Sequence, residues 1–511
     1  MPVDKTTKHI LLFGAGKSAT VLIDYLKNLS AKEGYKVTIA DSNLQSVQKK
    51  AGEQPNIFAV ALDVTNADER QTQIQTADVI ISLMPPHLHN LIALDCLKFK
   101  KHLLTASYVD EELKKHAAEI KESNILFLCE MGLDPGIDHM SAMHLIDGIK
   151  NKGGKITSFK SHCGGLVAPE SDDNPWHYKI SWNPHNIVMA GKAGAHYKEN
   201  NKEVRLSYEQ LFSAEHNVNV PGLGNYSYYA NRDSLSYVPL YHLDDISTFI
   251  RTTLRHPDFC FGWKNIIDLK LTDEEKVYDT NGLSISDFFK QHFERHGFSE
   301  WLTQLLSTRF EYAKKMMEQL MNLMQAEQEA IDEGEKPEDD FMMIDEDGKL
   351  TTLNVDEVKS RAAESVAVQM HEANLTLKQL FFLGLNDDII IDKGLCSAAD
   401  VLQFILETKL ALQPHDKDMI IMLHEIEYES PHPLKESNNK INKITSCLVV
   451  KGEDNIHTAM AKTVGLPLGI AAKLILEERI TETGLHIPVL PSIYNPVLKE
   501  LQQNGIIFNE S

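Results

Sequence analysis

The apolar positions in the first quarter of the chain form short runs separated by longer amphipathic stretches. Residues 9–13 (HILLF) and 36–41 (KVTIAD) are runs of strand length, and residues 17–29 between them have helical spacing. Three further apolar runs continue the alternation: FAVALDVT, ADVIISLMP and KHLLTASY. This alternation predicts a Rossmann-type, doubly wound parallel sheet in a dinucleotide-binding domain over residues 1–134.

The pattern changes after residue 134. Residues 135–254 mix strand-like and helical segments and contain many aromatic side chains, which predicts a second, mixed α/β domain for substrate binding and dimerisation. Residues 255–414 are mainly helical in pattern, and we expect them to form an inserted all-helical domain. Residues 415–511 begin with two strand-like runs, so we expect a return to the second domain, followed by C-terminal helices. The predicted fold class is therefore α/β.

Length and charge narrow the possible functions. A chain of 511 residues suggests about three domains at roughly 150 residues each. The formal charge of −22 argues against nucleic acid and anionic membranes as partners, because binding them requires clustered Lys and Arg. The six cysteines contain no CxxC pair and no apolar run approaches eighteen residues, so we expect a cytoplasmic protein with reduced thiols.

One strongly acidic segment, residues 326–348, lies within the helical part. Its IDEDGK tip lacks the oxygen-ligand spacing and the distal Glu of a calcium-binding EF-hand. We interpret it as a solvated linker or hairpin, and the sequence assigns it no function.

A glycine-rich turn between the first strand and the first helix indicates the cofactor site. Gly14, Gly16 and Ala19 fit the G-x-G-x-x-G/A pattern, and the helix that follows Lys17 and Ser18 directs its N-terminus at the turn. A Walker-type phosphate loop is excluded because Leu11 stands where that motif requires glycine.

The end of the second strand bears on the choice of cofactor. Asp41 stands where a carboxylate accepts hydrogen bonds from the ribose hydroxyls of NAD and repels the 2′-phosphate of NADP. Ser42 and Asn43 follow it rather than Arg, so we expect NAD, although Lys49 or Lys50 could reach a phosphate. An ordinary turn aspartate is the alternative.

Two further segments contain residue types typical of a reactive site. Residues 130–142 (EMGLDPGIDHMSA) follow an apolar strand and contain Asp134, and residues 161–182 place Cys163 beside two glycines. Taken alone, each has a structural interpretation: Asp134 as a turn residue before Pro135, and Cys163 as a small buried side chain.

These segments resemble the saccharopine dehydrogenase family, in its glutamate-forming branch, also called saccharopine reductase. The resemblance continues in the same order through most of the chain, in five more motifs: YANRDSL, FIRTTLRHP, FFLGLNDD, DKDMIIMLHEIE and HTAMAKTVGLPLGIAAKLIL. It implies interconversion of saccharopine with L-glutamate and 2-aminoadipate 6-semialdehyde in lysine metabolism, by hydride transfer at a C–N bond and imine hydrolysis or formation.

The resemblance also implies roles for individual residues. Asp134, Cys163 and Tyr108 match the acid/base positions, and the sequence does not decide which of the three is essential. Beyond the glycine turn, the expected cofactor contacts are Asp63, Val64, Ser82, Leu83 and Ser107. The expected substrate contacts are Ser107, Tyr108, Asp134, Ser181, Arg232, Arg251, Thr252 and Thr253. Among them, the guanidinium groups of the two arginines are expected to bind carboxylates of the substrate.

Several expectations complete this interpretation. We assign no metal, because His139 and His177 are accompanied by no HxxxH motif or thiolate cluster. The resemblance suggests a homodimer acting on a small amino-acid substrate. Two alternatives stay open: a carboxyspermidine-type dehydrogenase of the same superfamily, and a non-catalytic protein that senses dinucleotides.

Overall fold

The structure is a computed structural model that describes residues 7–212, 216–332, 340–344, 350–430 and 441–511. It divides into two compact units. Unit 1 contains residues up to Asp173, His177–Cys260 and Leu410–Ser511, and unit 2 contains Asn174–Trp176 and Phe261–Lys409. Since this division keeps the predicted dinucleotide and substrate domains together, the boundary between those two domains stays a prediction.

Within the described part of unit 1, seven parallel strands form the first sheet. In spatial order they are β20 (Gly484–His486), β6 (Leu126–Leu128), β5 (His102–Thr105), β4 (Val79–Ser82), β1 (His9–Phe13), β2 (Lys36–Asp41) and β3 (Ile57–Ala61). All neighbours in this sheet are parallel, and the order reverses between β1 and β4. The predicted Rossmann-type sheet is therefore confirmed, and the point of reversal is where such sheets bind ligands.

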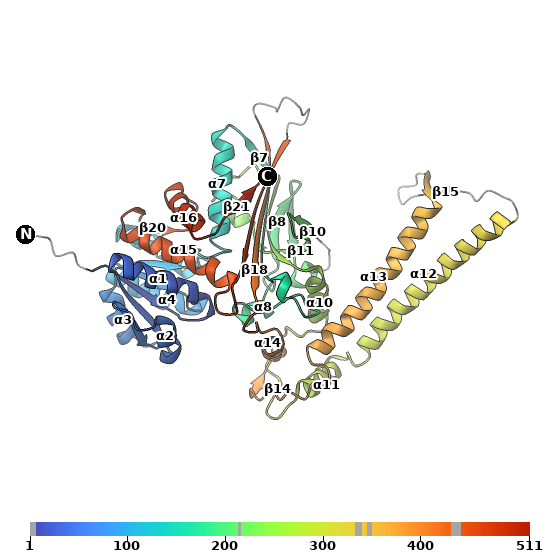
Figure 1. Cartoon of the computed structure of the whole chain (residues 1–511), viewed down its shortest axis with the longest axis horizontal. Helices are drawn as coiled ribbons and strands as arrows, with labels where there is room; N and C mark the ends of the chain where they lie inside the picture. The colour runs from blue at the N-terminus through green and yellow to red at the C-terminus, as the bar shows by residue number, and fades with distance from the viewer. Residues whose placement is uncertain (1–6, 213–215, 333–339, 345–349, 431–440) are drawn as a thin grey trace, which may run out of the picture. The chain divides into compact units, whose positions relative to one another are not determined.

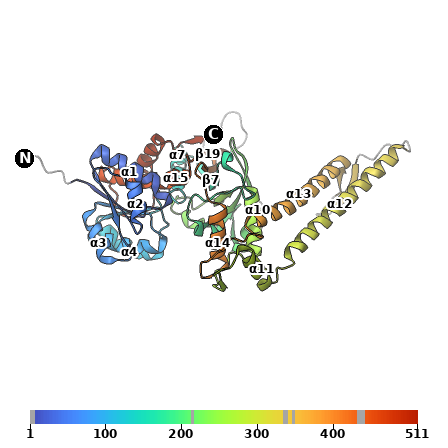
Figure 2. The same cartoon turned by 60° about the horizontal axis from the view of Figure 1, so that its bottom comes forward.

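Helices cover both faces of this sheet, because successive side chains of each strand point to opposite sides. In β1, Ile10 and Leu12 belong to one buried cluster, and Leu11 and Phe13 belong to the other. Figure 2 shows α1 and α15 on one side and α3 and α4 on the other. The helices of this region are α1 (Thr20–Glu33), α2 (Leu44–Ala51), α3 (Ala67–Thr76), α4 (Pro86–Phe99), α5 (Glu111–Lys115), α6 (Ala117–Glu122) and α15 (Ala459–Leu476).

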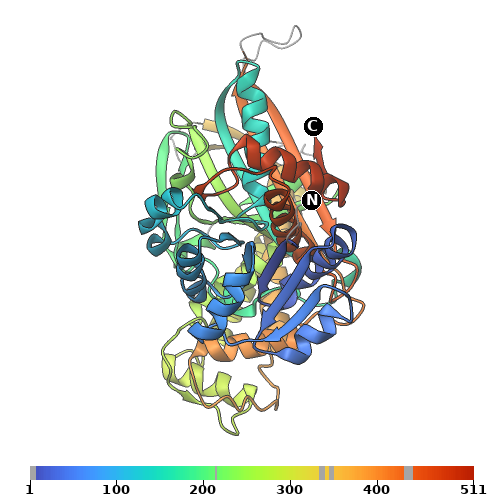
Figure 3. The same cartoon turned by 90° about the vertical axis from the view of Figure 1, so that its left-hand side faces the viewer.

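Helix α15 comes from the last tenth of the chain and packs against α1. A Cβ atom added to Gly465 would lie 2.9 Å from the Cβ of Leu22, so glycine permits this close approach of the two helices. By length and composition α15 could cross a membrane, but 83% of its apolar window is buried inside the protein, as in the core helix of a folded domain. Figure 3 shows these C-terminal helices, in red, beside the blue N-terminal elements.

The second sheet of unit 1 is mixed. Its main path is β10 (Asn217–Val220), β11 (Gly224–Ala230), β13 (Thr248–Arg255), β7 (Lys155–Val167), β18 (Asp418–Glu429), β19 (Ile441–Lys451) and β21 (Phe508–Glu510). Strand β8 (Ala195–Glu199) pairs with β13, β9 (Lys202–Leu206) and β12 (Arg232–Asp233). The remaining α-helices that lie wholly in this unit are α7 (Ile137–Asn151), α8 (Pro184–Val188), α9 (Tyr208–Leu211) and α16 (Pro491–Gln503). A mixed second sheet agrees with the predicted fold class.

Unit 2 is mainly helical. It contains most of α10 (Pro257–Asp268), α11 (Ile285–His296), α12 (Trp301–Asp332), α13 (Val355–Phe382) and α14 (Ala398–Lys409). Figure 1 shows α12 and α13 as a long pair of neighbouring helices.

Two short antiparallel sheets accompany the helices of unit 2. They pair β14 (Tyr278–Asp279) with β17 (Leu395–Cys396), and β15 (Asp340–Ile344) with β16 (Leu350–Asn354). Within the acidic segment 326–348, residues 333–339 and 345–348 lie outside the described residues.

Candidate active site

The glycine turn between β1 and α1 has the shape that a bound pyrophosphate requires. Gly14 has φ +97°, and a Cβ there would lie 3.0 Å from the carbonyl oxygen of Leu83, so this position favours glycine. Gly16 differs, because nothing lies within 4 Å of an added Cβ. Ala19 is buried in the short helical turn Lys17–Ala19 that leads into α1. The open space beside Gly16 therefore fits a group that approaches the backbone.

Asp41 ends β2 beside this turn, but the chain itself occupies both carboxylate oxygens. One accepts a hydrogen bond from the amide of Ala15 at 2.8 Å, and the other accepts one from the amide of Asn43 at 3.0 Å. The ammonium group of Lys50 donates to the carbonyl oxygens of Ala15 and Gly16, at 2.8 and 2.6 Å. A cation thus lies at the turn, close to the carboxylate that was expected to repel phosphate.

His89 of α4 links two residues that the sequence predicts as cofactor contacts. Its Nδ1 lies 2.8 Å from the hydroxyl of Ser82, and its Nε2 lies 2.8 Å from the hydroxyl of Ser107. Burial lowers the pKa of His89 to about 4, so the ring is neutral and can donate from only one nitrogen. The sequence analysis missed His89, because a lone histidine within an amphipathic helix gives no signal of its own.

The other predicted cofactor contacts lie at the ends of neighbouring strands. Leu83 follows β4 and packs against Gly14. Asp63 is exposed after β3 and accepts hydrogen bonds from the amide and hydroxyl of Thr65, which lower its pKa. Val64 is buried in the core of the first sheet.

The centre of the candidate site is a buried arginine between two carboxylates. Nη2 of Arg251, on β13, donates to Asp134 at 2.6 Å and to Asp138 at 2.7 Å. The Arg251 side chain is 4% exposed, that of Asp138 is 2% exposed and that of Asp134 is 13% exposed. The amide of Gly136 also donates to Asp138, at 2.6 Å. Asp134 is thus the carboxylate of this trio that retains access to solvent.

Burial and charge give the two carboxyl groups different acidities. Burial raises the pKa of Asp134 to about 6, against the opposing effect of the Arg251 cation. Burial also raises the pKa of Asp138, but the neighbouring His139 and Arg251 and the Gly136 amide outweigh it, and the net pKa is lowered. Such divergence between neighbouring acids is typical of sites that carry out acid/base chemistry.

Tyr108 and Cys163, the other two predicted acid/base residues, lie next to Asp134. The Tyr108 hydroxyl is 3.5 Å from Oδ1 of Asp134, and burial raises its pKa, as does the charge of Asp134. Burial also raises the pKa of the Cys163 thiol, and the charges of Asp134 and Asp138 add to this effect. Both groups are therefore protonated near neutral pH. The structure brings the three predicted residues together, and their roles stay predictions.

Arg232 lies at the same site in a different environment. It is exposed at φ +50°, and its guanidinium lies 5.2 Å from the centre of the Tyr108 ring. Its neighbour in the chain, Asp233, lies 3.2 Å from His196.

Strand geometry separates the predicted threonine contacts. Arg251 and Thr253 lie on one face of β13, and Thr252 lies on the other. The Thr252 hydroxyl is 2.7 Å from Nδ1 of His162, whereas Thr253 is a hydrogen-bond partner of Tyr229. Thr252 therefore points away from the face that carries Arg251.

Ser181, a further predicted substrate contact, is buried with its hydroxyl bonded to Asp418. The Asp418 carboxylate also accepts hydrogen bonds from the first amides of α15, at 2.6 and 2.9 Å. The contact that the structure shows for Ser181 is thus structural, since it helps to fix the start of a core helix. Its predicted contact with substrate stays a prediction.

A second buried network, made of hydrogen bonds to Glu130, packs against Arg251 through the ring of Tyr237. Nε2 of His139 lies 2.9 Å from Glu130, which also accepts a hydrogen bond from the Tyr237 hydroxyl at 3.1 Å. The Tyr237 ring stacks on His139 and lies 4.4 Å from the Arg251 guanidinium. Glu130 has φ +57°, an uncommon conformation for a residue with a side chain. The sequence analysis placed Glu130 and His139 in a reactive segment but gave them no role.

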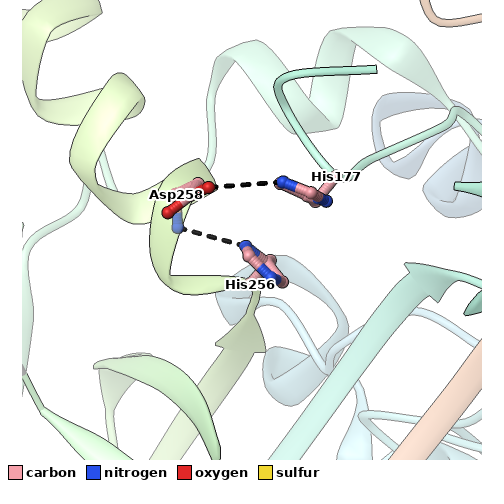
Figure 4. A group of neighbouring side chains, drawn as sticks. All are labelled: His177, His256 and Asp258. Atoms are coloured by element: carbon pink, nitrogen blue, oxygen red, sulfur yellow. Dashed lines mark hydrogen bonds and ion pairs between the residues drawn. The ribbon is translucent and has the colours of Figure 1, made fainter. Parts of the chain in front are cut away.

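A separate group of possible metal ligands lies elsewhere in unit 1. His177, His256 and Asp258 have ligand atoms that all lie within 4.8 Å of one another (Figure 4). The sequence analysis assigned no metal, because His177 is accompanied by no HxxxH motif or thiolate cluster, and it did not consider His256 or Asp258. Their proximity depends on where β13 ends, which no local pattern reveals.

The fold and this geometry define a class: Rossmann proteins in which the strand ends of the dinucleotide-type sheet meet a polar site on a second sheet. Family models match nearly the whole chain. Residues 10–128 match the saccharopine dehydrogenase NADP binding domain, and residues 132–506 match the saccharopine dehydrogenase C-terminal domain. The chain belongs to the saccharopine dehydrogenase family, which confirms the resemblance seen in the sequence.

Known relatives agree with this assignment. The saccharopine dehydrogenase [NADP(+), L-glutamate-forming] of Saccharomyces cerevisiae is 30% identical over 98% of this chain and 99% of its own length. The alpha-aminoadipic semialdehyde synthases of Arabidopsis thaliana and mouse are each 30% identical, and this chain spans only 44% and 48% of them. The apo structure of saccharopine dehydrogenase (L-Glu forming) from Saccharomyces cerevisiae has a TM-score of 0.76 at 27% identity, with 99% of both chains covered.

These comparisons correct the expected cofactor. The N-terminal family model is described as NADP binding, and three fungal relatives are named NADP(+) enzymes, so the expectation of NAD is wrong. The physical reason lies beside the turn. Both oxygens of Asp41 already accept hydrogen bonds from backbone amides, and the charge of the nearby Lys50 ammonium offsets that of the carboxylate. A strand-end carboxylate is therefore insufficient evidence for NAD.

Proposed function

We propose that this protein is an NADP-dependent saccharopine dehydrogenase that oxidises saccharopine to L-glutamate and 2-aminoadipate 6-semialdehyde. The observation that carries the proposal is the buried bridge from Arg251 to Asp134 and Asp138, next to Tyr108 and Arg232. The fungal relative whose length this chain matches is named for this activity. The bridge supplies a fixed cation and an acid of altered pKa for such a reaction, and Arg232 supplies a second cation beside it.

The two arginines suit a substrate with three carboxylates. Arg232 is exposed and free to form a bidentate pair with a carboxylate, and its stacking on Tyr108 restricts its position. Arg251 is buried and already bonded to Asp134, so it orients that carboxyl group and adjusts its acidity. In this proposal Arg232 recognises the substrate, and Arg251 positions the reacting acid.

Asp134 is the proposed base. In the oxidative direction the secondary amine must lose a proton, and later steps must deliver protons to the carbinolamine formed by water attack on the imine. A carboxyl group of pKa about 6 is mostly ionised at neutral pH and can accept the first proton. Tyr108 and Cys163 remain protonated and are proposed as hydrogen-bond donors to the same centre.

The NADP cofactor would be held by the glycine turn, with the pyrophosphate beside Gly16 and the 2′-phosphate near Lys50. When bound, it supplies the hydride acceptor for the C–N oxidation. The chain holds the strand-end hydroxyls of Ser82 and Ser107 in fixed positions through His89.

The test is saccharopine-dependent reduction of NADP by the purified chain, with glutamate measured as product. We expect turnover with NADP, less with NAD, and stoichiometric glutamate. Carboxyspermidine in the same assay tests the polyamine alternative. Binding of NADPH without turnover of either substrate would contradict the proposal and favour a dinucleotide-sensing protein.

A further inference from the structure

Three potential metal ligands meet where β13 ends and α10 begins. His256 follows β13, Asp258 lies in the first turn of α10, and His177 comes from the loop before α8. Figure 4 shows the side chains of His177 and Asp258 directed at each other above His256. The two imidazole rings stack with centroids 3.9 Å apart. All three residues are partly buried, so the group is shielded but accessible to a small ion.

A second carboxylate orients His177. Nδ1 of His177 lies 2.6 Å from Asp172, which directs Nε2 at Asp258, 3.3 Å away. Histidines that bind metals usually have this arrangement, in which one ring nitrogen bonds a carboxylate and the other faces the ion. The second oxygen of Asp172 is buried with no hydrogen-bond partner in the described structure. Both carboxylates thus contact His177, whereas Nδ1 of His256 accepts a hydrogen bond from the amide of Asp258 at 3.2 Å, which leaves Nε2 of His256 as its ligand atom.

We propose that His177, His256 and Asp258 bind a divalent transition-metal ion of the Zn²⁺ class, with Asp172 holding His177 in place. Two imidazoles and a carboxylate are borderline ligands that suit Zn²⁺, whereas Mg²⁺ and Ca²⁺ prefer a shell of oxygens. Ligands around a tetrahedral Zn²⁺ at about 2.1 Å lie about 3.4 Å apart. The contact from His177 to Asp258 already has this separation, and the other ligand atoms lie within 4.8 Å, so the stacked rings must turn toward a common point to bind one ion.

The position of the site indicates a structural role. His177 is the first residue of unit 1 after the excursion Asn174–Trp176, and Asp258 lies two residues before Cys260, where the chain again leaves unit 1. The ion would therefore cross-link the segment around His177 to the segment 256–258, each of which lies next to a point where the chain leaves unit 1. The ligands belong to none of the residues assigned to the proposed reaction, so this inference does not depend on the proposed function.

The test uses the full chain, freed of metal with a chelator and then titrated with Zn²⁺. We expect about one tightly bound zinc per chain and an increase in thermal midpoint. Co²⁺ serves as a spectroscopic probe, and we expect the visible absorption of a tetrahedral ion. If the chelator-treated chain binds no zinc, or if Co²⁺ shows only the weak spectrum of an octahedral aquo ion, the proposal is overturned.

Variants distinguish a built site from surface binding. His256→Ala and Asp258→Asn should weaken zinc binding at least about 100-fold, and Asp172→Asn about 10- to 100-fold. The matched control is His457→Gln, since His457 also lies between two aspartates, Asp24 and Asp454, but has no second histidine in reach among the described residues. The control should bind zinc like the wild type.

Two results would contradict the proposal with these variants. One is unchanged zinc binding in His256→Ala and Asp258→Asn, which would mean that His177 forms only ion pairs. The other is a loss of zinc binding in His457→Gln as large as that in the ligand variants. Circular dichroism of the metal-free proteins shows whether each variant is folded. If His256→Ala fails to fold, the test is Asp172→Asn, which removes no ligand. Unchanged zinc binding in that variant would then contradict the proposal.

Discussion

Arg251 and Arg232 have the same side chain in opposite environments, and the difference assigns them different tasks. Arg251 is buried and compensates two carboxylates, whereas Arg232 is exposed above a tyrosine ring. Removing a buried cation leaves uncompensated charges, which is far more destabilising than losing an exposed one. The sequence predicted that both bind substrate but could not separate these environments.

A pair of substitutions measures this difference. Arg251→Met should lower the free energy of unfolding by about 3–5 kcal/mol, because Asp134 and Asp138 lose their cation. Arg232→Met should change it by less than about 0.5 kcal/mol and should raise KM for saccharopine. Thermal unfolding and steady-state kinetics give the two measurements. Equal loss of stability in both variants would refute the assigned environments.

The raised pKa of Asp134 gives a pH prediction. A base must be ionised to accept a proton, so kcat/KM for saccharopine oxidation should fall tenfold per pH unit below about 6. Asp134→Asn should lower kcat by about 10²- to 10⁴-fold and abolish this limb of the profile. The measurement is a pH–rate profile of both proteins. An unchanged limb in Asp134→Asn would show that another group is the base.

Lys50 is the residue on which the cofactor preference should depend. Lys50→Met removes the cation at the glycine turn, so KM for NADP should rise at least about tenfold while KM for NAD changes little. Lys49→Met is the matched control, because among the described residues the ammonium group of Lys49 makes no contact with the turn, unlike that of Lys50. Loss of NADP preference in Lys49→Met alone would refute this assignment.

At the scale of elements, the glycine turn is the feature that the sequence predicted best. A strand, a turn and a helix at fixed spacing form a local pattern, and the structure places them as expected. The alternation of side chains along a strand is equally local, and applied to β13 it separates Arg251 from Thr252. His89 is different, since it acts by linking residues of two strands through a helix, and no sequence period indicates such a link.

Gly16→Ala tests the turn without disturbing the fold. Gly16 has an ordinary φ of −65° and open space at its Cβ, so the thermal midpoint of the cofactor-free protein should be unchanged. The methyl group occupies the space left for the pyrophosphate, and the Kd for NADPH should rise at least about tenfold. Gly34→Ala, at φ +74° after α1, should show the reverse: about 1 kcal/mol less stability and an unchanged Kd. Fluorescence titration and thermal unfolding measure both.

At the scale of the whole molecule, a buried histidine predicts acid sensitivity. Burial lowers the pKa of His424 to about 4, with Nε2 bonded to the Ser141 hydroxyl at 2.7 Å. A depressed histidine pKa contributes stability above its unfolded value of about 6.5, and that stability is lost as pH falls towards 4. The loss should reach about 3 kcal/mol at pH 4, and His424→Gln should remove it. The measurement is the thermal midpoint of the wild type and of His424→Gln between pH 7 and 4. An equal fall of the two midpoints with pH would refute the prediction.

Long-range assembly is what the sequence could not reveal. The doubly wound sheet and the order of segments follow from local periodicity. The assignment of Asp134, Tyr108 and Cys163 to one site rests instead on the resemblance of their motifs to a known family. The bridge from Arg251 to Asp138 joins residues 113 positions apart, and the support from Glu130 depends on an unusual backbone angle. Such contacts arise from packing and leave no trace in composition or spacing.

The return of the C-terminal segment to the first sheet affects how the chain is made. Strand β20 extends that sheet beside β6, and α15 covers the apolar side of α1, more than 400 residues away in the sequence. During synthesis the glycine turn and α1 therefore leave the ribosome long before α15, which covers α1, has been made. A fragment ending near residue 134 should expose Leu22 and Ile23 to water and aggregate, and a nascent chain should complete the packing around its glycine turn only after residue 476 has been synthesised.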